Sequence, residues 1–246
     1  MKILWVKADF LHPTNRGGQI RTLEILKRLR LRHEIHFVGI EDPQQPEGVA
    51  RSGEYCSYAY PVRHRVPHKA SLAFAGQLVR GLYSPLPVAV ERYRSRAMRR
   101  TVDDLLARHR FDSVVCDFLF PAPNISALES CVLFAHNVEA MIWKRHVEHA
   151  AGWPRRLYFR LQARRMFAYE RHVCRRVKSV ITVSQADADV VRGSYGVERV
   201  RPVPTGVDVG YFEPKDGSEP SARLVFLGSK YPTSTPVGTG RTRSTP

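Results

Sequence analysis

The stretch CVLFAHNVEAMIWKRH, residues 131–146, contains the two patterns that decide the fold. Residues 131–136 are an apolar run of strand length, and from residue 138 onward apolar residues recur at helical spacing. His136 and Asn137 lie where the strand ends, and Glu139 lies in the first turn of the helix. Ligands of α/β sheets bind at the carboxyl ends of the strands, so these three side chains are candidates for a binding site.

The same strand-then-helix unit repeats along the chain. The predicted strands cover residues 2–7, 34–40, 55–62, 112–118, 131–136, 179–184 and 200–204. The predicted helices cover residues 17–31, 68–82, 94–109, 138–149, 154–177 and 185–193, with an irregular loop region near 41–68. Short apolar strands that alternate with helices predict an α/β fold, a Rossmann-like parallel sheet with helices on both faces.

Two more strand ends carry candidate residues. Gly17 and Gly18 lie where the first loop enters a helix, and their backbone N–H groups suit a phosphate. Ser184 ends a strand and precedes a helix. Each candidate also has a purely structural explanation: a plain turn for the glycines and a helix cap for Ser184. A helix-start carboxylate would equally explain Glu139, and His136 could be a loop-edge histidine without a ligand.

Composition narrows the class of protein. The net charge of +16 comes mainly from 31 arginines that are spread along the chain without a nucleic-acid-binding motif, so no nucleic-acid partner is expected. The cysteines lack metal-ligand spacing, which indicates buried thiols and no metal site. Neither a signal peptide nor a membrane-spanning run is recognisable, and we expect a cytoplasmic location.

A long basic helix is the predicted element whose composition most suggests a binding partner. In WPRRLYFRLQARRMFAYERHVCRRV, residues 153–177, apolar residues trace one stripe and arginines crowd the remaining surface. A core-facing helix with a solvated basic face would explain this pattern. The alternative is a surface that touches anionic lipid or a polyphosphate, which would make the protein peripheral at the inner face of the plasma membrane.

Taken together and in order, five stretches resemble glycosyltransferase family 4, whose members have the GT-B fold. They are the glycine pair of the first loop, HNVEA at 136–140, YERHVCRRVKSVITVSQAD at 169–187, VRPVPTGVDVGYFEP at 200–214 and RLVFLGS at 223–229. The chain is most similar to the sugar transferases of bacterial exopolysaccharide systems. The resemblance covers about residues 1–229 and implies the N-terminal, acceptor-side domain of a retaining, nucleotide-sugar-dependent enzyme.

The resemblance also implies roles for single residues. Gly17 and Gly18 match the loop that faces the donor diphosphate, and His136 matches a catalytic histidine that contacts the donor sugar. Ser184 lies at the rim of the cleft, while Asn137 and Glu139 belong to the same substrate-binding match as His136. Thr205 stands where the family usually has Asn. The implied partners are a nucleotide sugar and a saccharide or lipid-linked acceptor, with no metal and no other cofactor.

The end of the chain departs from the family pattern. We expect an acceptor-side domain at 1–205, an interdomain connection with the first strand of a truncated second domain at 206–229, and a disordered, out-of-frame tail at 230–246. The tail has 17 residues, of which 5 are Thr and 3 are Pro, so it cannot build a core. We therefore expect no sugar transfer from the chain as it stands. The alternative function is a catalytically inactive fragment or a binding module for a phosphorylated or polyanionic partner.

Overall fold

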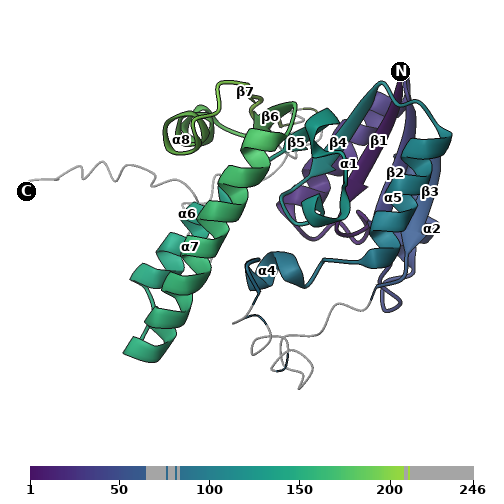
Figure 1. Ribbon diagram of the computed structural model, residues 1–246. Helices are drawn as coiled ribbons and strands as arrows, with labels where there is room; N and C mark the ends of the chain where they lie inside the picture. Colours follow the sequence, from purple (N-terminus) through teal and green to yellow (C-terminus); the bar gives the residue numbers. More distant parts are fainter. Residues whose placement is uncertain (65–75, 77–80, 82–83, 208–209, 211–246) are drawn as a thin grey trace, which may run out of the picture.

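The computed structural model describes residues 1–64, 76, 81, 84–207 and 210. Its centre is one seven-stranded parallel sheet with the strand order β3-β2-β1-β4-β5-β6-β7 (Figure 1). The strands are β1 (Lys2–Lys7), β2 (Glu34–Ile40), β3 (Tyr58–Val62), β4 (Ser113–Asp117), β5 (Cys131–Phe134), β6 (Ser179–Thr182) and β7 (Val200–Pro202). The predicted parallel sheet is thus confirmed, and each predicted strand overlaps an observed one.

Helices connect the strands. They are α1 (Gly17–Arg30), α2 (Glu47–Ala50), α4 (Val88–Glu91), α5 (Arg96–Arg108), α6 (Glu139–Glu148), α7 (Trp153–Arg176) and α8 (Gln185–Tyr195), with short 3-10 turns at Ser52–Glu54, Ala122–Asn124 and Leu128–Ser130. The one-turn helices α2 and α4 were not predicted, because four residues are too few to show a helical period. The predicted helix at 68–82 lies outside the described residues except for positions 76 and 81. The predicted connection, strand and tail at 206–246 also lie outside them, except for positions 206, 207 and 210.

Both faces of the sheet are covered. Successive side chains of β1 point to opposite faces, so Ile3 and Trp5 join the core beneath α1, and Leu4 and Val6 join the core on the other face. That second core includes buried side chains of α5, α7 and α8. Burial on both faces explains why the strands read as almost uninterrupted apolar runs.

The direction of the connections changes at the centre of the sheet. From β1 the chain passes to β2 and β3 on one side, and it then returns to β4 on the other side. Lys7, the last residue of β1, pairs in register with Asp117, the last residue of β4. In open α/β sheets the crevice at such a switch point is the usual position for a ligand.

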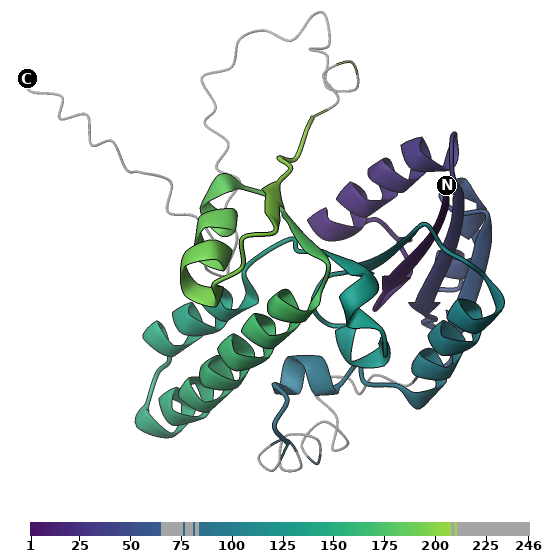
Figure 2. The ribbon, with the colours of Figure 1, turned by 45° about the horizontal axis from the view of Figure 1, so that its top comes forward.

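Helices α6 and α7 form a hairpin that projects from the sheet (Figures 1 and 2). The C-terminal half of α7 is anchored by buried side chains, among them Met166 and Val173. The first turn of α7 and the loop before it extend beyond this anchor, and residues 151–157 are all exposed. No helix within the described ranges is long and apolar enough to cross a membrane.

Candidate functional site

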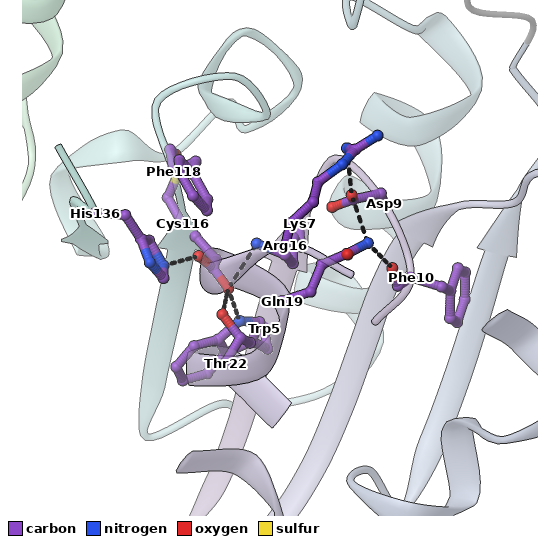
Figure 3. Close-up of polar contacts among 11 residues, drawn as sticks. Trp5, Lys7, Asp9, Phe10, Arg16, Gln19, Thr22, Cys116, Phe118 and His136 are labelled. Carbon is purple, nitrogen blue, oxygen red and sulfur yellow. Dashed lines mark hydrogen bonds and ion pairs between the residues drawn. The ribbon is translucent and has the colours of Figure 1, made fainter. Parts of the chain in front are cut away.

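Asp117 is the centre of a buried polar cluster at the switch point. Its carboxylate is fully buried and has four polar contacts, which are drawn in Figure 3: Trp5 Nε1 at 2.9 Å, Thr22 Oγ1 at 2.8 Å, His136 Nε2 at 2.8 Å and Lys7 Nζ at 3.3 Å. These side chains come from β1, from α1 and from the loop after β5. The cluster therefore connects β1, α1, β4 and the loop after β5 at the switch point.

The charges in this cluster follow from its contacts. Burial alone would raise the pKa of Asp117, but Lys7 and the hydrogen bonds of His136 and Trp5 outweigh it and lower the pKa to about 2. Burial lowers the pKa of His136 below its usual value, although Asp117 opposes this effect. At neutral pH the carboxylate is therefore ionised and the imidazole is neutral. An ionised carboxylate can only accept, so Nε2 of His136 carries the proton and Nδ1 is left as an acceptor.

Phe118 and Gly18 fix the position of the His136 ring. The Phe118 ring stacks on His136 with 4.0 Å between ring centroids and 3° between planes, and Lys7 Nζ lies 4.3 Å from the centroid of the Phe118 ring. Phe118 has a positive φ of 67°, which is uncommon for a bulky residue. A Cβ atom at Gly18 would lie only 2.6 Å from the Phe118 ring, whereas one at Gly17 would meet nothing within 4 Å. The close approach of this loop therefore requires glycine at 18 and not at 17.

The N-terminus of α1 lies at the edge of the cluster. It begins at Gly17 without a side-chain cap and without an acidic residue in its first turn. Arg16 immediately precedes it and pairs loosely with Asp9 at 3.6 Å, while Gln19 donates to the same carboxylate at 3.2 Å. Free N–H groups at a helix start attract anions, and a nearby arginine strengthens that attraction.

The structure thus brings together Gly17, Gly18 and His136 of the predicted site residues. Asn137 is half-buried beside His136. Ser184 is the N-cap of α8, where it accepts from the Asp187 N–H at 3.1 Å and donates to the Asp187 carboxylate at 2.7 Å. The capping role that the sequence offered for Ser184 is therefore present, and its part in binding stays a prediction.

Glu139 lies in a different polar cluster, between α6, α7 and α8. The Glu170 carboxylate accepts from the backbone N–H groups of Glu139 and Ala140, both at 2.9 Å, and from the Tyr195 hydroxyl at 2.7 Å. Burial, and then the charge of Glu170, raise the pKa of Glu139 to about 8. In the part of the chain that the structure describes, no hydrogen bond or ion pair joins Glu139 to the Asp117 cluster, and its role in binding also stays a prediction.

A row of rings leads away from His136. The Phe118 ring lies 6.1 Å from Phe120, and Phe120 lies 5.5 Å from Tyr93, all centroid to centroid. The guanidinium of Arg92 is 5.5 Å from the centroid of the Tyr93 ring. Arg92 also lines a cavity between α4 and the α6–α7 hairpin, whose other walls are Val88, Ala89, Trp143, His146, His149, Ala150, Ala151, Arg155 and Phe159.

Asp117 and Lys7 were not among the predicted site residues. Both lay inside runs that the sequence assigned to strands, 112–118 and 2–7. The available signal was a charged side chain at the carboxyl end of an otherwise apolar strand, where the fold places its ligands. Among the described residues, no group of three or more His, Cys, Asp and Glu side chains is arranged to hold a metal ion. The expectation of a metal-free reaction stays a prediction.

The fold and the sequence match a known family. The model of the family Glycosyltransferase Family 4 matches residues 15–211, and the chain belongs to that family. No curated protein matches the chain.

Solved structures are similar only at low identity. A UDP-glucosyltransferase from Polygonum tinctorium, described as capable of glucosylating indoxyl and solved with 3,4-dichloroaniline, is 12% identical with a TM-score of 0.44, over 83% of this chain and 52% of that one. A UGT transferase from Siraitia grosvenorii in complex with UDP is 11% identical with a TM-score of 0.45, over 82% and 50%. A short chain dehydrogenase/reductase from Saccharomyces cerevisiae is 9% identical with a TM-score of 0.34, over 79% and 76%. The chain spans about half the length of the two transferases.

Proposed function

We propose that this chain forms the acceptor-side domain of a retaining glycosyltransferase, which transfers a sugar from a nucleotide-sugar donor to a saccharide or lipid-linked acceptor. The observation that carries the proposal is the Asp117 cluster at the switch point, with the uncapped start of α1 beside it. This arrangement supports binding of a diphosphate at Gly17 and Gly18 and of a sugar hydroxyl at His136.

In the proposed reaction the protein orients the substrates and stabilises the charge that develops on the leaving group. The bond between the anomeric carbon and the diphosphate oxygen breaks, and the acceptor oxygen forms its bond to that carbon on the same face. The proton of the acceptor hydroxyl passes to the departing phosphate oxygen, so no protein base is needed. The N–H groups of Gly17 and Gly18 stabilise the negative charge that develops on the departing phosphate. Nδ1 of His136 accepts a hydrogen bond from a sugar hydroxyl and so orients the donor. No protein nucleophile and no metal are required.

The row of rings supports the acceptor side of the proposal. Phe118, Phe120 and Tyr93 are each partly exposed, and the row ends at the cavity beside Arg92. Flat apolar rings flanked by a guanidinium suit a saccharide, which offers apolar C–H faces and hydroxyl acceptors. We therefore propose that the acceptor lies along this row.

A transfer assay tests the proposal. The chain is assayed alone and joined to the donor-binding domain of another family member, with labelled UDP-, GDP- and ADP-sugars and EDTA present. We expect the joined protein to transfer sugar with retained anomeric configuration and to lose transfer on His136→Ala. If the joined protein is folded and inactive while the chain alone binds polyanions such as heparin, the alternative of a non-enzymatic binding module is correct.

A further inference from the structure

The tip of the α6–α7 hairpin is the part of the molecule whose composition the transfer site does not explain. Trp153, the first residue of α7, is 78% exposed, and Leu157, one turn later, is 60% exposed. All of residues 151–157 are exposed. Large apolar side chains at these positions contribute little to the core, so folding alone gives no reason for them.

An apolar groove continues this surface along the hairpin. Its apolar lining residues are Val147 of α6 and Leu157, Leu161 and Ala163 of α7. Its charged lining residues are Lys144, Glu148, Arg160 and Arg164. The groove therefore combines apolar side chains with predominantly cationic ones.

The charged residues at the start of α7 are all cationic. Residues 153–165 contain five arginines and no acidic residue. Lys144, Arg160 and Arg164 are exposed, and within the described ranges none of their three side chains makes a hydrogen bond or an ion pair. These cations remain available to an anionic partner.

The combination of apolar and cationic side chains at the tip indicates which partner the tip binds. Cations alone would suit nucleic acid, and apolar residues alone would suit contact with a second copy of the chain. A helix that presents Trp and Leu beside several arginines suits an anionic bilayer, because the apolar side chains enter the boundary between headgroups and acyl chains while the cations meet phosphates. The projecting hairpin can reach a flat surface without hindrance from the sheet (Figures 1 and 2).

We propose that the tip of the α6–α7 hairpin, residues 144–164, is a membrane-contact surface that binds anionic lipid bilayers. Trp153 and Leu157 enter the interface, and Lys144, Arg160 and Arg164 bind headgroup phosphates. The proposal does not depend on the transfer reaction, since the surface lies outside the Asp117 cluster.

Vesicle co-sedimentation of the full chain tests this proposal. We expect binding to vesicles of phosphatidylcholine with phosphatidylglycerol and little binding to phosphatidylcholine alone. The variant Lys144→Gln/Arg160→Gln/Arg164→Gln should weaken binding on the order of a hundredfold, since each cation near an anionic surface is worth about fivefold. Trp153→Ser/Leu157→Ser should weaken binding while leaving the charge unchanged. Circular dichroism checks that both variants are folded.

The matched control removes three exposed arginines from α5, as Arg96→Gln/Arg100→Gln/Arg108→Gln, and should keep vesicle binding close to wild type. An equal loss in the α5 variant would overturn the proposal, because net charge would then be the cause. It would also be overturned by an absence of vesicle binding at low salt. Duplex DNA binding that competes with vesicles and is lost in the same tip variants would assign the surface to nucleic acid, and concentration-dependent dimerisation abolished by Trp153→Ser/Leu157→Ser would assign it to a second copy.

Discussion

Asp117 holds the site together through its charge. With Asp117→Asn, the buried ammonium of Lys7 loses its ionised partner. One of the two oxygens that accept from Trp5, Thr22 and His136 also becomes an NH₂ group, which can only donate. Removing one member of a buried ion pair commonly costs about 3–5 kcal/mol. We expect a loss of that order in urea unfolding. Asp104→Asn, an exposed change on α5, should leave the unfolding midpoint unchanged. Equal midpoints for wild type and Asp117→Asn would show that the cluster contributes no stability.

Gly17 and Gly18 are neighbours in the first loop, but substitution by alanine should affect stability differently at the two positions. Gly18→Ala places a Cβ against the ring of Phe118. The backbone of Phe118 already has a positive φ. The ring must therefore shift away from its stack on His136. We expect a loss of about 1–3 kcal/mol, the usual cost of overpacking. Gly17→Ala meets open space at a helix start and should be neutral or slightly stabilising. Thermal unfolding of both variants checks the difference, and similar effects would contradict the geometry.

At the scale of elements, Glu139 makes the packing of α6 against α7 and α8 sensitive to pH. Its folded-state pKa of about 8 is raised by burial and by Glu170, while in the unfolded chain it titrates near 4.5. The folded state therefore holds a proton that the unfolded state has lost, so this group's stabilising contribution is full below about pH 4.5 and falls as the pH rises through about 8.

Glu139→Gln removes that titration and keeps the shape of the side chain. We expect wild type to lose more unfolding free energy than Glu139→Gln between pH 5 and pH 8, by up to a few kcal/mol. The measurement is urea unfolding at both pH values. Glu148→Gln, an exposed change at the end of the same helix, should follow wild type. Parallel curves for wild type and Glu139→Gln would contradict a buried, protonated Glu139.

Comparison of the observed elements with the predicted ones shows which features could be predicted from the sequence. The apolar run at 131–136 and the helical period after it predicted β5 and α6 almost to the residue, because burial on both faces leaves strands apolar and helices periodic. The same reasoning placed Gly18 and His136 at one edge of the sheet. It could not predict the contact of Asp117 with Lys7, because that contact depends on which strands are neighbours, and β1 and β4 lie more than 100 residues apart in sequence. It also could not predict that the first turn of α7 projects beyond the core.

At the scale of the molecule, the order of the strands produces the site. Because the connections leave β1 and β4 on opposite sides, the sheet edge opens at Lys7 and Asp117, and α1 begins there with free N–H groups. The α6–α7 hairpin starts from the same edge, directly after His136 and Asn137. The proposed donor and acceptor sites thus lie at this edge of the sheet, and the hairpin that carries the proposed bilayer surface starts from it.

The most direct test of the central claim is a titration of the ¹⁵N-labelled chain with UDP-, GDP- and ADP-sugars, monitored by the backbone amide resonances. The account predicts that at least one of these donors shifts the resonances of Gly17, Gly18 and Asn137, even when binding is weak. The matching nucleoside, which lacks the diphosphate, should shift Gly17 and Gly18 much less. If every donor leaves these three resonances unmoved up to its solubility limit, or shifts only residues far from the Asp117 cluster, the switch point is not the donor site.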